Sequence, residues 1–279
     1  MTRHLGSVTH LRVLLVVVTL VAAAACGGKN PKSVLPANTA QPDQFLMDRG
    51  NQELQKKHWA KAREYFKQVV DNYPNSALRP DAKLAVGDTY MSEGGADNEV
   101  LAENEFREFL TFYPTNPRAD YAQYQLAMTH FKQMRSAERD QTETKDAVKE
   151  FQTFFDRFPN SKYMPEVRQK WREARDRLSE ASYRVGLYYY RVKWYPGAVS
   201  RFREVLMEDP GYTHRDDVYF YLAECYANTP TQKAEAIPYL QRLITEFPKS
   251  ERLEDARKRM QELQAEQAEQ AVKTQVKAQ

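Results

Sequence analysis

Cysteine, glycine and histidine are all scarce in this chain. Its 279 residues include two cysteines, ten glycines and five histidines. They contain no Cys-x-x-Cys pair, no His-Glu-x-x-His motif and no glycine-rich phosphate loop. So few glycines argue against an all-β fold with many tight turns, and the abundant Ala, Glu, Gln, Lys and Arg favour long helices. We therefore expect an all-α protein with no metal site and no cofactor.

The histidines are also too dispersed to suggest catalysis. His4 and His10 stand near the amino terminus, and His58, His130 and His214 are far apart in the sequence. General acid–base catalysis needs such groups within hydrogen-bond reach of one substrate. We therefore expect that the protein is not an enzyme and has no catalytic residues.

An excess of positive charge is missing as well. The chain has 41 Lys and Arg against 38 Asp and Glu, a net charge of +3. Removal of an export signal that contains Arg3 and Arg12 leaves 39 basic against 38 acidic side chains. Proteins that bind the nucleic-acid backbone concentrate basic residues. Nucleic acid is therefore not an expected partner.

Only one long apolar run is present, over residues 13–21, and small residues 22–25 follow it up to Cys26. The run is shorter than the about 20 residues of a membrane-spanning helix and fits the apolar core of a signal peptide. The stretch that ends at Cys26 resembles a lipobox, in which the cysteine receives diacylglycerol and becomes the new amino terminus. This predicts a lipoprotein signal over residues 1–25 and lipidation of Cys26, with an ordinary signal peptide as the alternative.

The segment after the cysteine predicts a tether and a destination. Residues 26–43 are rich in Pro, Gly and Asn without periodicity, so we expect the acylated cysteine to be followed by a flexible tether. Gly27 takes the place where an Asp retains lipoproteins of enteric bacteria in the inner membrane. Where that sorting rule applies, the expected location is the outer membrane, with the acyl chains as the anchor.

Five prolines mark an internal repeat, and four of them follow an aromatic residue. The dipeptides are Tyr73-Pro74, Tyr113-Pro114, Phe158-Pro159 and Phe247-Pro248, with Asp209-Pro210 as a variant. An alanine stands twelve residues before each proline, and a phenylalanine or leucine eight residues before it. The pairs are Ala62 and Phe66, Ala102 and Phe106, Ala147 and Phe151, Ala198 and Phe202, and Ala236 and Leu240. These offsets place the side chains on one stripe of a helix that the proline ends.

Each of these helices is predicted to pair with a helix that precedes it. Small residues stand thirteen residues after three of the prolines, at Gly87, Ala127 and Ala223. Serines after the prolines, at Ser76, Ser161 and Ser250, offer N-cap chemistry for the following helix. The pattern resembles the tetratricopeptide repeat, most fully at Gly186, Tyr189, Ala198, Phe202 and Pro210. We predict a superhelical array of about five tetratricopeptide-like helix pairs.

One extended helix is expected to divide the array. In the other units the small residue stands thirteen residues after the proline, but Gly186 stands 27 residues after Pro159. The fourteen additional residues make nearly four helical turns. This predicts a helix of about 30 residues over 163–193, with an inner face lined by Val167, Trp171, Leu178 and Val185. It joins repeats 1–3 (residues 44–180) to repeats 4 and 5 (residues 181–264), and a Gln/Ala-rich tail follows over 265–279. Loops near residues 93–96 and 134–144 are expected to lengthen the second and third units.

Three stretches outside the repeat consensus, at residues 109–122, 139–142 and 188–198, resemble the BamD family of outer-membrane assembly lipoproteins. The resemblance implies a periplasm-facing scaffold that docks a barrel-forming factor through one of its POTRA domains. Unfolded outer-membrane proteins and other assembly lipoproteins are further implied partners. Another cell-envelope repeat lipoprotein, associated with peptidoglycan or with secretion, is the alternative.

The resemblance also selects candidate binding residues. A basic residue on the second helix of the fourth repeat pairs with an acidic POTRA group in that family, and the matching position here is Arg201. Tyr188, Tyr190 and Arg191 are further partner-binding candidates. Tyr121, Tyr124 and Phe131 are candidates for a substrate groove that accepts an extended peptide. The alternatives are a solvated arginine and, for the aromatic residues, packing between helices.

Overall fold

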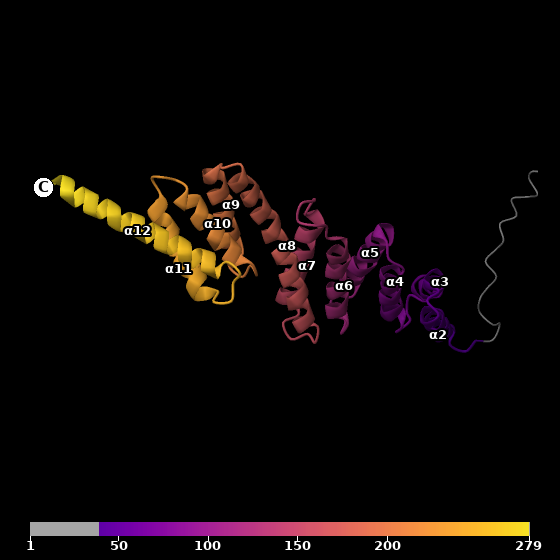
Figure 1. The fold of residues 1–279 in the computed structure, drawn as a ribbon. Helices are drawn as coiled ribbons and strands as arrows, with labels where there is room; N and C mark the ends of the chain where they lie inside the picture. Colours follow the sequence, from indigo (N-terminus) through magenta and orange to yellow (C-terminus); the bar gives the residue numbers. More distant parts are fainter. Residues whose placement is uncertain (1–38, 279) are drawn as a thin grey trace, which may run out of the picture.

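The computed structural model describes residues 39–278, which form helices stacked in chain order from α2 to α12 (Figure 1). The prediction of lipidation at Cys26 lies outside the described residues.

The predicted array of five helix pairs is confirmed, with α12 following the last pair. The pairs are α2 (Pro42–Gln55) with α3 (Trp59–Asn72), α4 (Arg79–Glu93) with α5 (Ala96–Phe112), α6 (Ala119–Gln133) with α7 (Thr142–Arg157), α8 (Met164–Arg191) with α9 (Tyr195–Glu208), and α10 (Arg215–Ala227) with α11 (Ala236–Glu246). A short 3-10 turn, η2 (Lys233–Glu235), precedes α11, and α12 spans Leu253–Ala278. Between residues 39 and 278, no helix is both long and apolar enough to cross a membrane.

Each second helix ends two residues before the proline that marks its repeat. Helix α3 ends at Asn72, and the Tyr73 amide closes it by donating to the carbonyl of Val69 at 3.2 Å. Helices α5, α7, α9 and α11 end in the same way. The reason is that a proline disfavours helical conformation in the residue before it and has no amide proton to donate.

The repeat positions form the core of every pair. All five alanines, the four phenylalanines and Leu240 are completely buried. In three units the aromatic ring lies against the backbone of a glycine on the first helix. A Cβ atom on Gly50, Gly87 or Gly186 would lie only 2.4, 2.7 or 2.6 Å from the ring of Phe66, Phe106 or Phe202, respectively. The missing side chain therefore sets how closely the two helices approach.

The serines after the prolines do not cap helices, so the expected N-cap role is wrong. The helix N-caps within the array make no side-chain capping bond. Instead the Ser76 hydroxyl donates to the Asp43 carboxylate of the preceding unit at 2.6 Å and accepts from the Leu78 amide at 3.0 Å. Ser161 and Ser250 donate to Asp120 and Asp216 in the same way, at 2.7 and 2.5 Å. The turn after the proline therefore links one repeat to the next through a hydrogen bond from serine to aspartate.

The 28-residue helix α8 confirms the predicted long helix, but its faces differ from the expectation. Its buried residues are Val167, Ala174, Ser179, Tyr183 and Gly186. Trp171 and Leu178 are only half-buried, and Val185 is 40% exposed, so the prediction of an inner position is wrong for Val185. The physical reason is that α7 and α9 pack against different faces of the same helix. The proposed division at residue 180 falls within α8 and stays a prediction.

The extra length of the second unit is helical. Only Gly94 and Gly95 separate α4 from α5, and their φ values of +74° and +92° give a tight turn that side chains would oppose. Helix α5 begins six residues before Ala102, whereas α3 begins three residues before Ala62. The loop expected near residues 93–96 is therefore an added helical turn. The loop of the third unit is present between α6 and α7, over residues 134–141.

The contact between glycine and aromatic ring can be tested at Gly186. We expect Gly186→Ala to lower the free energy of unfolding by about 1–3 kcal/mol, because the new methyl group meets the Phe202 ring. The fifth unit combines Ala223 with Leu240, which suggests a matched rescue. In urea unfolding, the double variant Gly186→Ala/Phe202→Leu should cost less than the sum of the two single changes. Additive costs would contradict the proposed contact.

Candidate partner-binding cleft

A cleft of about 840 Å³ lies where the chain passes from the third unit to the fourth. Its walls are the loop between α6 and α7, the middle and carboxy-terminal part of α8, and α9. Basic, acidic and apolar side chains all line it. A concave site of this size is within the range of ordinary ligand pockets, and its breadth over three elements suits a protein segment.

The structure brings together two of the four predicted partner-binding residues. Arg201 and Tyr188 both line the cleft. The Arg201 side chain is 43% exposed and forms an ion pair of 2.8 Å with Glu204, one turn further along α9. The Tyr188 side chain is 61% exposed, with its ring 5.8 Å from that of Tyr189. An exposed cation, Arg201, and an exposed aromatic ring, Tyr188, therefore line the same cleft.

The other two candidates lie elsewhere. Tyr190 is half-buried in the carboxy-terminal core, where its ring centroid lies 6.1 Å from Tyr195 and 5.2 Å from Tyr221. Arg191 is the last residue of α8 and is exposed. Successive helical residues point about 100° apart, so Tyr188 and Tyr190 cannot face the same surface. All four assignments stay predictions.

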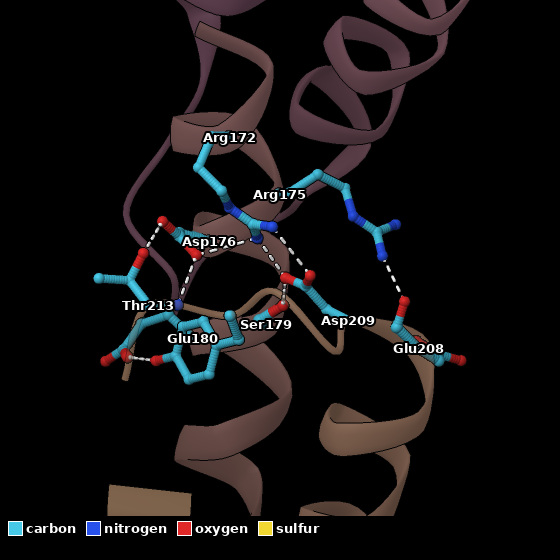
Figure 2. A network of polar contacts seen from close by, with 9 residues as sticks. Arg172, Arg175, Asp176, Ser179, Glu180, Glu208, Asp209 and Thr213 are labelled. Atoms are coloured by element: carbon cyan, nitrogen blue, oxygen red, sulfur yellow. Dashed lines mark hydrogen bonds and ion pairs between the residues drawn. The ribbon is translucent and has the colours of Figure 1, made fainter. Parts of the chain in front are cut away.

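Asp209 lines the cleft and is only 4% exposed. Arg172 donates to both carboxylate oxygens, with Nη1 at 2.9 Å from Oδ1, and Ser179 donates its hydroxyl at 2.6 Å (Figure 2). Burial raises the pKa of the Asp209 carboxyl, but the hydrogen bonds from Arg172 and Ser179 outweigh it, so the pKa lies below its usual value. Asp209 is therefore a buried anion that joins α9 to α8.

Further polar contacts extend this connection between α8 and α9, which we call the joint, along α8. Figure 2 shows Asp176 accepting from the amide and hydroxyl of Thr213, at 3.0 and 2.6 Å. Tyr212 donates its hydroxyl to Glu180 at 2.6 Å, and Arg175 donates to the carbonyl of Glu208. The turn between α9 and α10 is thus fixed on α8 by hydrogen bonds and charges.

Sequence reasoning missed this joint although two signals were present. Asp209 replaces the aromatic residue that precedes the repeat proline in the other units. Arg172 stands thirteen residues after Pro159, where other units have Gly or Ala. The two departures from the consensus carry opposite charges, and the fold places them in contact.

The substrate-groove candidates make contacts between helices. Tyr124 stacks on Tyr163 with a centroid distance of 5.5 Å and donates its hydroxyl to Glu166 at 2.6 Å. Tyr121 donates its hydroxyl to Asp88 at 2.7 Å. The ring of Phe131 meets that of Phe151 edge-on at 6.1 Å. These contacts favour the packing role, and the groove assignment stays a prediction.

One group of side chains between residues 39 and 278 has the spacing of a metal site. Ligand atoms of His214, Asp216 and Asp217 lie within 4.8 Å of one another. Asp216 already accepts from Ser250, and Asp217 from Arg252 at 2.8 Å. Both carboxylates therefore have structural partners.

Comparisons with known proteins agree with the repeat fold and with the resemblance to assembly lipoproteins. The sequence pattern of the YfiO family, described as an outer membrane lipoprotein, matches residues 39–233, and a tetratricopeptide pattern matches residues 217–250. The outer membrane protein assembly factor BamD of Caulobacter vibrioides is 29% identical over 209 residues, which cover 74% of this chain and 67% of that relative. BamD of Xylella fastidiosa (strain 9a5c) is 24% identical over 230 residues, covering 79% and 76%. Among solved structures, the TPR2AB domain of yeast Sti1, in a complex with pHSP90, matches with a TM-score of 0.46 and 14% identity over 82% of this chain and 86% of that one.

The buried anion can be tested with Asp209→Asn. At pH 7 we expect the free energy of unfolding to fall by about 1.5–3 kcal/mol, because Arg172 loses a charged acceptor. The native pKa of Asp209 is lowered, so its charge stabilises the fold above the unfolded pKa, and this contribution is lost as the pH falls through the native pKa. The difference between wild type and variant should therefore shrink below about pH 4.

Urea unfolding between pH 7 and pH 3 measures this difference. Asp71→Asn, at an exposed position on α3, is the matched control and should have little effect at any pH. A difference for Asp209→Asn that stays constant down to pH 3 would rule out the charged joint.

Proposed function

The chain belongs to the family of outer-membrane lipoproteins that includes BamD, and from this premise we propose that it is a lipid-anchored scaffold of the outer-membrane β-barrel assembly machine. The pattern match over residues 39–233 and the BamD relatives support a role in outer-membrane protein assembly. The family and the repeat fold are of the scaffold type. In this proposal acyl chains on Cys26 hold the protein at the outer membrane, with the array facing the periplasm.

The observation that carries the docking proposal is the shared position of Arg201 and Tyr188 in one cleft. The ion pair of Arg201 with Glu204 spans one exposed helical turn, and such pairs contribute only about 0.3–0.5 kcal/mol. Arg201 can therefore exchange Glu204 for an acidic group of a partner at little cost. Arginine and tyrosine are also the residues that contribute most often to binding hot spots. The proposed partner is a POTRA domain of the barrel-forming assembly protein.

A second part of the proposal concerns substrates. Tyr121, Tyr124 and Phe131 lie on α6 in the amino-terminal half of the array, away from the cleft. In this part of the proposal they contact an unfolded outer-membrane protein in extended form. We assign the face of α6 that carries these residues to this contact, so docking and substrate receipt use different surfaces.

The docking proposal is tested with Arg201→Glu. We expect the amount of POTRA-containing barrel protein recovered with the tagged lipoprotein from solubilised outer membranes to fall about fivefold or more, because the new carboxylate repels the acidic partner group. Arg242→Glu, at an exposed position on α11, is the matched control and should not change the recovery.

Two results of this experiment would count against the proposal. Equal recovery with wild type and Arg201→Glu would remove Arg201 from the interface. Recovery of peptidoglycan synthases or secretion components in place of a barrel protein would favour another kind of envelope scaffold.

A further inference from the structure

One face of α8 carries a regular pattern that packing within the array covers only in part, since Met164 and Trp171 pack on the core of the third unit while Val185 is exposed. Met164, Trp171, Leu178 and Val185 follow one another at intervals of seven residues. Four residues after each stand Arg168, Arg175, Ser182 and Tyr189. None of these eight side chains belongs to the fully buried set of α8. The pattern therefore describes an open stripe beside the buried face.

Three adjoining hollows follow this stripe. The cleft of about 840 Å³ includes Val185 and Leu178, a hollow of about 480 Å³ includes Leu178 and Trp171, and one of about 430 Å³ includes Trp171 and Met164. Neighbouring hollows share Leu178 or Trp171 as a lining residue, and we call this row of three hollows the α8 groove. Helix α7 borders its first part and α9 its last part. From Met164 to Val185 it is roughly 32 Å long at 1.5 Å per residue.

The spacing of the stripe indicates what shape fits the groove. Apolar residues that recur every seven positions lie along one line of a helix, as in one of the two rows by which helices pack along one another. The row four residues on is polar for three of its four members, Arg168, Arg175 and Ser182. An extended strand repeats every two residues and would not keep register with it. A helix in the α8 groove would meet Trp171, Leu178 and Val185 with residues of its own apolar stripe.

The charges along the groove indicate the chemistry of the partner. Lys145 and Lys149 on α7 and Arg168 on α8 are exposed and form no ion pair among the described residues, although the charge of Lys145 also acts on Asp140 in the loop before α7. Arg175 donates to the carbonyl of Glu208, and its charge also acts on the Asp209 carboxylate. These four cations of α7 and α8 border the apolar stripe.

The acidic residues of the groove do not cancel this charge. Glu138 is already paired with Arg184, and Glu204 with Arg201. Only Asp156 and Glu208 remain without a cation among the described groove residues. The lining of the three hollows together holds eight Lys and Arg side chains against five Asp and Glu side chains, so positive charge is locally in excess.

We propose that the α8 groove binds an acidic amphipathic helix of a partner protein. The apolar face of this helix covers Trp171, Leu178 and Val185, and its carboxylates meet the cations of α7 and α8. Charge complementarity of this kind raises the association rate and selects the partner. The contact goes beyond the proposed docking role, because it uses Lys149, Trp171 and Met164, which lie outside the cleft that Arg201 lines.

The proposal is tested by binding of synthetic helices to the purified chain. The probe is a fluorescent peptide of about 21 residues with leucine at the heptad a and d positions and glutamate beside them. The comparison peptide carries lysine at every glutamate position. At low ionic strength we expect the acidic peptide to bind about tenfold or more tightly than the basic one, as measured by fluorescence anisotropy.

Two double variants locate the binding. Lys145→Glu/Lys149→Glu reverses charge at two exposed groove positions, and we expect it to weaken binding of the acidic peptide about tenfold. Lys249→Glu/Lys258→Glu makes the same charge change at exposed positions outside the groove and should leave binding unchanged. Thermal melting by circular dichroism checks that both variants remain folded.

Several outcomes would overturn the proposal. Equal binding of both peptides, or equal loss in both double variants, would mean that the groove does not select acidic helices. Undiminished binding of an acidic peptide with a central proline would exclude a helical occupant. Dimerisation of the chain that Lys145→Glu/Lys149→Glu abolishes would show a second copy as the occupant. Peptide binding is measured on the purified chain alone, whereas recovery of the barrel protein is measured from solubilised outer membranes, so failure of the POTRA contact and failure of this contact are distinguishable.

Discussion

The crossing of the two helices in each repeat depends on a side chain that lies directly against a neighbouring backbone. In the first, second and fourth units a phenylalanine ring occupies the space that a Cβ atom of the facing glycine would need. The alanine four residues before each phenylalanine is also fully buried, so the helices are closely packed along this line. Tight interiors tolerate little change of volume, and the spacing of the pairs is therefore fixed from within. In the third unit, α6 with α7, Ala127 stands in place of the glycine and is also fully buried.

Helix α8 is where the regular stacking changes. The core around Phe151 and the core around Phe202 are separate apolar clusters, and α8 contributes residues to both. Between them the connection is polar, with Asp209 bound by Arg172 and Ser179. A buried ion pair adds little net stability compared with apolar packing, but its geometry is specific. The joint therefore defines how the fourth unit is oriented on α8.

The repeat positions and helix ends could be predicted from the sequence, because they depend on short-range periodicity and on proline. The orientation of α8 could not, since it depends on which faces α7 and α9 cover. Val185 fits an apolar inner stripe by spacing alone, yet it lies on the open groove. Likewise the sequence placed Tyr188 and Tyr190 in one set, and the structure separates them by helical rotation. Arg172 and Asp209 stand out in the sequence as departures from the repeat consensus. Their pairing could not be predicted, because it depends on how α9 is placed against α8.

These departures also explain why the candidate binding surfaces gather around α8. Side chains at the consensus positions are buried inside the helix pairs, so they are not available to a partner. At the joint, Arg172, Asp176 and Glu180 bind the end of α9 and the start of α10 on one face of α8. The neighbouring face is covered only in part: Trp171 packs on Phe155 and Leu178 is half-buried, whereas Val185 is exposed. The polar joint thus fixes how the fourth unit sits on α8, and part of the neighbouring face stays open to solvent.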